Sequence, residues 1–230
     1  MEKYAIVTGA SDGIGRAICE ALCREGVKVF GIGRKMPAQE IPGLTMHLLD
    51  MVEDPSAACD LVARLAKEYP IDLLVNNAGC AFYGLHENMA MNDIHAMVTL
   101  NLELPMLFTR ILLPKLRSRK GTVVMISSVT AKHASPHAAA YGATKAGLAA
   151  FSESIFEEVR KHGVKVVTIA PDLTRTHLYR NADFTTSDAA DECLYPSDVA
   201  DAVLFALQAR PGSVIREITL RPQKNRIVKK

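Results

Sequence analysis

The feature that most constrains the fold is an alternation of short apolar runs and amphipathic stretches, repeated along nearly the whole chain. Most of the apolar runs are rich in Val and Ile, and most are continuous rather than interrupted by polar residues. This pattern is typical of strands buried on both faces, as in a parallel sheet covered by helices. The runs are YAIVTG, VKVFGIG, LTMHLLD, IDLLVNN, GTVVMIS, VKVVTIAP and IREITL.

The stretches between these runs carry helical patterns. Because strands and helices alternate, the chain is predicted to form an α/β fold with a doubly wound parallel sheet. The length fits one domain, residues 1–230, and does not require two. The expected helices cover approximately residues 13–25, 55–69, 89–116, 138–162 and 197–208.

Composition excludes several classes of protein. Hydrophobic residues make up 49% of the chain and charged residues 23%, which predicts a sizeable core and argues against disorder. The net charge of +2 is too small to suggest nucleic acid or a membrane surface as a partner. No apolar run approaches the roughly 20 residues that span a bilayer. The sequence starts directly with a strand pattern, so a cytoplasmic protein is expected.

The five cysteines form an odd, scattered set, which argues against a disulfide framework. Cys19 and Cys23 lie four residues apart on an expected helix, a spacing that a metal site can use. Because no second pair of ligands lies nearby in the sequence, no metal site is predicted. Buried small apolar side chains are the preferred interpretation.

Two segments interrupt the alternating pattern. Residues 171–196 are long and polar with weak periodicity, and loops of this length in compact domains are often lids or binding loops. We therefore expect a substrate lid there, and a tolerated surface insertion is the alternative. The basic KNRIVKK at 224–230 is expected to be a frayed, solvated tail.

A glycine-rich turn, TGASDGIG at 8–15, links the first expected strand to the first expected helix. Its glycines permit a tight turn and close backbone approach, and the helix start offers free N–H groups to a pyrophosphate. The spacing G-x-x-x-G-x-G is weak evidence alone, but the strand–turn–helix context is the one that phosphate binding needs. The residues predicted to contact a cofactor here are Gly9, Ser11, Asp12, Gly13, Ile14 and Gly15.

The second expected strand ends at GIGRK, with Arg34 and Lys35 and no acid. An acid at this place would bind the ribose hydroxyl of NAD, whereas a basic residue accommodates the 2′-phosphate of NADP. The guanidinium of Arg34 matches phosphate oxygens, so NADP is favoured over NAD. Asp12 in the glycine turn argues in the opposite direction.

Further along the chain, TGASDGIG is followed by Asp50, NNAG at 76–79, Asn101, Ser128 and YGATK at 141–145. In order and spacing these motifs resemble the short-chain dehydrogenase/reductase family over almost the whole chain. The resemblance implies a Rossmann-type sheet of about seven strands, a nicotinamide cofactor, and hydride transfer to or from a carbonyl or alcohol carbon of a small molecule.

The resemblance also implies roles for individual residues. Asp50 and Met51 would lie near the adenine ring, and Thr176 would help to hold the nicotinamide or its phosphates. Asn101 would position a water molecule that relays protons to Lys145. Three residues, Asn77, Ala78 and Gly79, would line the adenosine-ribose side of the cleft, while Asn76 would brace the strands.

Two departures from the family pattern stand out. Pro171-Asp172 replaces the common Pro-Gly, so the loop over the nicotinamide is expected to run differently. The final strand, within REITLRP, lacks the Asp-Gly-Gly of many members. It resembles a smaller group of bacterial oxidoreductases, some similar to NADP-dependent dehydrogenases of small 3-hydroxy acids.

The proton chemistry centres on Tyr141. A free tyrosine has a pKa near 10 and is a reluctant proton shuttle at neutral pH. Lys145 lies one helical turn later on the same face, and its charge, together with that of an oxidised nicotinamide ring, is expected to lower the pKa of Tyr141. Tyr141 would then be the general acid in reduction and the general base in oxidation, and it would also contact the cofactor with Lys145. Ser128 would orient the substrate oxygen, with Ser127 as the neighbouring candidate pointing to the opposite side.

Other interpretations stay open. Arg175 and Arg180 in the lid would suit an anionic substrate, or they are surface arginines on a mobile loop. A different class of function is a nicotinamide sensor or scaffold without turnover, although such a protein would not need Tyr141. A homodimer or homotetramer is predicted by the family resemblance and by the many apolar residues of two expected helices, 89–116 and 138–162.

Overall fold

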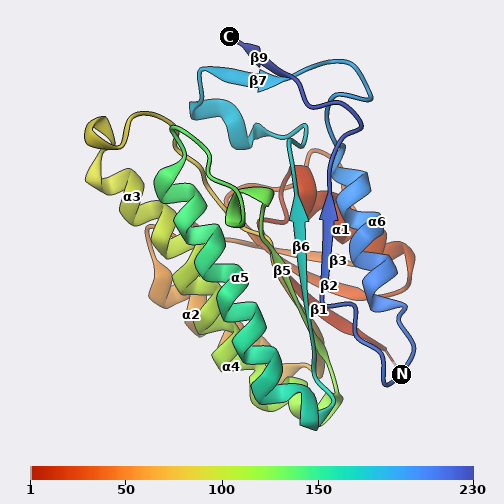
Figure 1. The fold of residues 1–230 in the computed structure, drawn as a ribbon. Helices are drawn as coiled ribbons and strands as arrows, with labels where there is room; N and C mark the ends of the chain where they lie inside the picture. Colours follow the sequence, from red (N-terminus) through yellow and green to blue (C-terminus); the bar gives the residue numbers. More distant parts are fainter. Residues whose placement is uncertain (1) are drawn as a thin grey trace.

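The computed structural model describes residues 2–230. Its main sheet is parallel, with strand order β3-β2-β1-β4-β5-β6-β8 (Figure 1). The order progresses outward from β1 and β4 in both directions, as in a doubly wound Rossmann-type fold. This confirms the predicted fold class and the seven predicted strands. The strands are β1 (Tyr4–Thr8), β2 (Lys28–Gly33), β3 (Leu44–Leu48), β4 (Ile71–Asn76), β5 (Thr122–Ile126), β6 (Lys165–Pro171) and β8 (Glu217–Leu220).

Helices cover both faces of the sheet. Helices α2 (Pro55–Glu68), α4 (Leu104–Arg119) and α5 (Ala139–Val159) lie on one face. Helices α1 (Gly13–Arg24) and α6 (Pro196–Leu207) lie on the other (Figure 1). This two-sided cover explains why the strands are apolar along their whole length, since both side-chain directions of each strand are buried.

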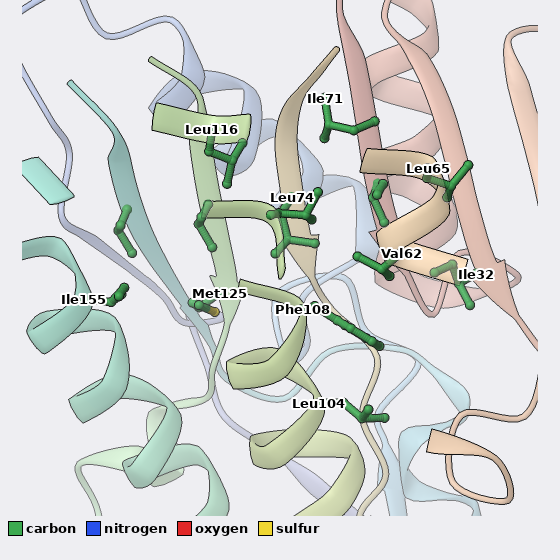
Figure 2. Close-up of a cluster of buried hydrophobic side chains, with 14 of the residues drawn as sticks. Ile32, Val62, Leu65, Ile71, Leu74, Leu104, Phe108, Leu116, Met125 and Ile155 are labelled. Atoms are coloured by element: carbon green, nitrogen blue, oxygen red, sulfur yellow. The ribbon is translucent and has the colours of Figure 1, made fainter. Parts of the chain in front are cut away.

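Two apolar clusters fill the layers between helices and sheet. Figure 2 shows one of them, in which Leu104 and Phe108 of α4 lie in the same cluster as Leu74 of β4 and Met125 of β5. Phe108 is 1% exposed, and truncating a buried Phe to Ala typically costs about 3–5 kcal/mol. The second cluster joins α1 and α6 to the opposite face. Together they make the sheet a rigid support for its loops.

The helical stretch before β5 is not a regular helix. Helix α3 (Met91–Val98) passes through a π-helical turn (Thr99–Glu103) into α4. By length and composition the continuous stretch Met91–Arg119 could cross a membrane, although no run of that length was expected. In this fold it is a core helix: Leu104, Phe108, Leu112 and Leu116 are buried against the sheet side.

The 171–196 segment and the segment 221–230 lie together above the carboxyl ends of β6 and β8 (Figure 1). The first holds a short 3₁₀ helix, His177–Asn181, and the strand β7 (Phe184–Thr186). The second forms β9 (Ile227–Lys229), which pairs antiparallel with β7. The expectation of a frayed tail was therefore wrong: the segment is short and polar, and a partner strand far away in sequence supplies its hydrogen bonds.

Candidate functional site

The glycine turn at the end of β1 has the backbone shape that its sequence suggests. Gly9 and Gly13 have φ of +68° and +53°, where side chains are disfavoured. A side chain on Gly15 would collide with the carbonyl oxygen of Gly9. The turn therefore brings the start of α1 close to the sheet edge and exposes a backbone cradle of the kind that phosphates bind. Ile14 is partly buried against the α1–α6 cluster.

The residues after β4 support this turn. Asn77 donates from Nδ2 to the Thr8 carbonyl oxygen at 2.8 Å, and its own amide donates to Thr8 Oγ1 at 3.0 Å. The Ala78 amide donates to the same hydroxyl at 3.0 Å. Asn76 is buried and donates from Nδ2 to Met125 Sδ on β5 at 3.2 Å and to Thr109 Oγ1 on α4 at 3.4 Å. Gly79 lies beside Asn101 and Lys145 rather than beside the glycine turn.

Two basic side chains from elsewhere in the chain lie close to the carboxylate of Asp12. His177 Nδ1 lies 2.6 Å from Asp12 Oδ2, and Lys35 Nζ lies 3.7 Å from it. Partial burial acts to raise the pKa of Asp12, but the Gly13 amide, His177 and Lys35 outweigh it and hold that pKa below its usual value. Lys35 thus offsets part of the negative charge that argued against NADP. Thr176 also lies against Gly13, so residues 176 and 177 cover the turn.

Arg34 follows β2 with its side chain 60% exposed, and its Nη1 lies 3.6 Å from Asp50 Oδ2. Nearby, the Ser11 hydroxyl lies against Gly33 and is buried without a hydrogen-bond partner among the described residues. A buried hydroxyl usually has a partner, so this one is suited to a phosphate or ribose oxygen. The side chain of Met51 is 5% exposed and packs in the core, and its place near the adenine ring stays a prediction.

Ser128, Tyr141 and Lys145 converge at the carboxyl end of β5, although two of them come from α5. All three side chains are buried. Lys145 Nζ donates to the Ile126 carbonyl oxygen at 2.9 Å and lies 5.8 Å from the centre of the Tyr141 ring. Ser128 Oγ accepts from Thr130 Oγ1 at 2.9 Å, which leaves its own proton available. Ser127 instead donates to the Lys145 carbonyl oxygen at 3.1 Å, away from this group, as expected.

The pKa of Tyr141 is raised in the protein alone, so Lys145 without a bound nicotinamide does not produce the expected lowering. Burial is the largest cause, the neighbouring Tyr179 adds to it, and a hydrogen bond with Ser128 only partly offsets both. Burial also lowers the pKa of Lys145 to about 8. A lysine with this pKa is still mostly protonated at pH 7, but its charge does not outweigh the cost of burying a phenolate.

Asn101 is fully buried in the π-helical turn and makes three hydrogen bonds. Its Oδ1 accepts from the Cys80 amide at 2.9 Å, and its Nδ2 donates to the Cys80 carbonyl oxygen at 2.9 Å and to Thr144 Oγ1 at 3.1 Å. Both amide protons are therefore used within the protein. The three bonds tie α3–α4 to the loop after β4 and to α5.

An aromatic group covers Tyr141, and sequence reasoning missed two of its members. Tyr83 lies 6.2 Å from Tyr141 between ring centres, and Phe184 packs edge-on against Tyr83 at 5.0 Å. Tyr179 lies 5.5 Å from Phe184 and 6.2 Å from Tyr83. We call Tyr83, Tyr179 and Phe184 the aromatic wall. The sequence gives little indication of this group: Tyr83 follows NNAG, and Tyr179 and Phe184 lie in the 171–196 segment.

The two arginines considered as anion ligands differ in their contacts and exposure. Arg175 donates from Nη2 to the Ser187 carbonyl oxygen at 2.9 Å, lies 3.4 Å from Asp188, and stacks on the Tyr195 ring at 5.2 Å. It is thus held within its own segment. Arg180 is exposed. Among residues 2–230, no cluster of three His, Cys, Asp or Glu side chains is placed to hold a metal ion, and the five cysteines are free.

Comparison with known proteins gives one consistent answer. The model of the short chain dehydrogenase family matches residues 3–186. An uncharacterised oxidoreductase of Staphylococcus saprophyticus is 29% identical, over 96% of this chain and 97% of its own. A metagenomic short-chain oxidoreductase solved with NADP is 28% identical, covers 96% of each chain and has a TM-score of 0.75. Serine dehydrogenase from Escherichia coli is 27% identical, the match covers 94% of this chain and 96% of that one, and the TM-score is 0.79.

Proposed function

The chain belongs to the short-chain dehydrogenase/reductase family of oxidoreductases, and on that premise we propose that it moves a hydride between NADP(H) and a carbonyl or alcohol carbon of a small molecule. The observation that carries the proposal is the convergence of Ser128, Tyr141 and Lys145 at the carboxyl end of β5. Ligands of open α/β sheets bind at that edge. The 171–196 segment, which lies above it, is proposed as the substrate lid.

The residues that would hold the cofactor fit its parts. The glycine turn offers backbone N–H groups to the pyrophosphate, and Thr176 lies beside it. Arg34 and the unpartnered Ser11 hydroxyl lie at the end of β2, where a 2′-phosphate is read. The similar metagenomic oxidoreductase was solved with NADP, which supports the same preference. Asp50, Asn77, Ala78 and Gly79 line the rest of the cleft in this proposal.

When bound, the nicotinamide carries the hydride and, in its oxidised form, a positive charge. Tyr141 is the proton donor to the substrate oxygen in reduction and the acceptor in oxidation. The Ser128 hydroxyl holds that oxygen towards Tyr141. Because the pKa of Tyr141 is raised in the protein alone, the charge of Lys145 has to be supplemented by that of the bound cofactor; each unit of lowering needs about 1.4 kcal/mol.

Asn101 is proposed as a residue that positions this group, because it fixes α5 through Thr144. The relay of protons from Lys145 through a water molecule on Asn101 stays a prediction. Both Nδ2 protons of Asn101 and one lone pair of its Oδ1 are already used in hydrogen bonds within the protein. Only one Oδ1 lone pair therefore remains for such a water.

Cofactor choice is tested by titrating the protein with NADPH and NADH. The chain has no tryptophan, so the emission of the reduced nicotinamide itself is followed. We expect NADPH to bind at least tenfold tighter, about 1.4 kcal/mol, and Arg34→Ala to close the gap. Lys28→Ala, at the exposed start of the same strand, is the control. Equal affinity for the two cofactors in the unchanged protein would refute the assignment of Arg34.

Turnover is tested with a panel of ketones and NADPH, followed by the matching alcohols and NADP. Tyr141→Phe should abolish turnover and leave NADPH affinity within about twofold, because only the proton donor is removed. A sensor or scaffold would show no turnover with any carbonyl in the unchanged protein. In that case the substitution would have nothing to abolish, and the enzymatic proposal would fail.

A further inference from the structure

Asp172, which replaces the glycine common in the family, anchors the segment 221–230. Its side chain is 13% exposed, and its Oδ2 lies 3.6 Å from Arg221 Nε and accepts from Asn225 Nδ2 at 3.2 Å. Its Oδ1 accepts from the Leu173 amide at 2.8 Å. One carboxylate therefore fixes both the chain leaving β6 and the start of the 221–230 segment. Glycine at this position would offer neither contact.

Lys230 fixes the other end of the same segment. Its ammonium donates to three carbonyl oxygens, those of Tyr179 at 2.7 Å, Ala182 at 3.0 Å and Arg180 at 3.3 Å. Its backbone amide donates to the Asp183 carbonyl oxygen at 2.8 Å. These carbonyls belong to the last turn of the 3₁₀ helix and to the residues leading into β7. Between the two ends, β9 pairs residue by residue with β7.

The parts of the lid held in this way carry the aromatic wall. Tyr179 lies within the turn that Lys230 caps, and Phe184 is the β7 residue paired with Lys229. Both rings contact Tyr83, which in turn packs on Tyr141. A shift of the 221–230 segment would therefore move two of the three rings over the proposed proton donor.

We propose that the 221–230 segment, through Lys230 and Asp172, positions Tyr179 and Phe184 as the wall against which an aromatic or branched aliphatic group of an uncharged substrate packs. The inference rests on the proposed hydride transfer and names its substrate class. Tyr83 packs on the ring of Tyr141, and Tyr179 and Phe184 pack on Tyr83. Of the two lid arginines that could pair with a carboxylate, Arg175 is engaged by Ser187 and Asp188, and Arg180 is exposed.

The test compares Lys230→Met with Lys229→Met. Each change removes one positive charge from β9 or its end, but the Lys229 side chain makes no hydrogen bond or ion pair with the described residues. The first measurement is hydrogen exchange of the peptide covering residues 177–186. We expect exchange there to be at least tenfold faster in Lys230→Met and unchanged in Lys229→Met. Equal exchange in the two variants would overturn the positioning role.

The second measurement is steady-state kinetics with an aryl alkyl ketone, a small aliphatic ketone and a keto acid. We expect the unchanged protein to prefer the aryl ketone, and Lys230→Met to raise its KM about tenfold while kcat for the small ketone and NADPH affinity stay within twofold. A preference for the keto acid would overturn the substrate class. Equal losses for all substrates together with weaker NADPH binding would overturn the positioning role. Absence of all turnover would instead refute the proposed function, and the exchange measurement would still decide whether the segment holds the lid.

Discussion

Replacing Asn101 by Ala should destabilise the protein substantially, because the side chain bridges three parts of the fold. It accepts from the Cys80 amide and donates to the Cys80 carbonyl oxygen and to Thr144 Oγ1, all within 3.1 Å, and it is 0% exposed. The Thr144 hydroxyl keeps a partner after the substitution, since it also donates to the Tyr141 carbonyl oxygen. The Cys80 amide and carbonyl lose theirs.

The expected magnitude follows from these two backbone groups. Each buried polar group left without a partner costs about 1–3 kcal/mol. The variant should therefore lose about 2–6 kcal/mol of unfolding free energy. For a chain of this size, about 1 kcal/mol shifts Tm by roughly 2–4 °C, so a decrease of about 4–24 °C is expected.

Differential scanning calorimetry checks this prediction, with Asn92→Ala as the control. Asn92 is an exposed asparagine of α3, nine residues earlier on the same helical stretch, and its truncation should change stability by less than about 0.5 kcal/mol. The reasoning would be refuted by an Asn101→Ala variant within about 1 kcal/mol of the unchanged protein. That result would mean that the Cys80 groups find other partners.

Three further predictions follow from the site and its surroundings. Lys145→Met should be more stable than the unchanged protein by about 1–3 kcal/mol below pH 8. Burial lowers the pKa of Lys145 to about 8, so the folded state binds fewer protons than the unfolded state between about pH 8 and 10.5, and the difference should vanish across that window. Urea unfolding at pH 7 and pH 10 measures it, and a difference independent of pH would contradict the burial argument. Gly15→Ala should abolish NADPH binding, because its methyl group would meet the Gly9 carbonyl oxygen; retained affinity in fluorescence titration would show that the turn can open. Light scattering should give two or four times the 25.0 kDa of one chain, and a mass of one chain would remove the predicted dimer or tetramer.

The main sheet and the approximate place of the site could be predicted because their signals are local. Continuous Val- and Ile-rich runs identify buried strands, and the glycines of the 8–15 turn lie next to one another in the sequence. The order and spacing of Ser128, Tyr141 and Lys145 then predict the group proposed to react. In each case the residues that form the predicted feature are the same residues whose pattern predicts it.

The remaining features depend on neighbours that are distant in sequence. Asp12 lies in contact with His177, 165 residues later, a neighbour that the sequence did not show when Asp12 was counted against NADP. Strand β9 has a polar sequence and exists because β7 pairs with it. The pKa of Tyr141 is raised chiefly by burial, to which the neighbouring Tyr179 adds, whereas the sequence shows only the lysine one turn away.

The central position of β1 in the sheet affects the order in which the chain can fold. β1 pairs with β2 on one side and with β4 on the other, so it joins the half formed by β2 and β3 to the half formed by β4, β5, β6 and β8. Closing the β1–β4 seam brings residues 4–7 to residues 71–75, a long-range contact of the kind that slows folding. The glycine turn leaves β1 and Asn77 follows β4, and their hydrogen bonds cross this seam. A refolding chain therefore completes the phosphate cradle only when its two halves join, and recovery of cofactor affinity would time that event.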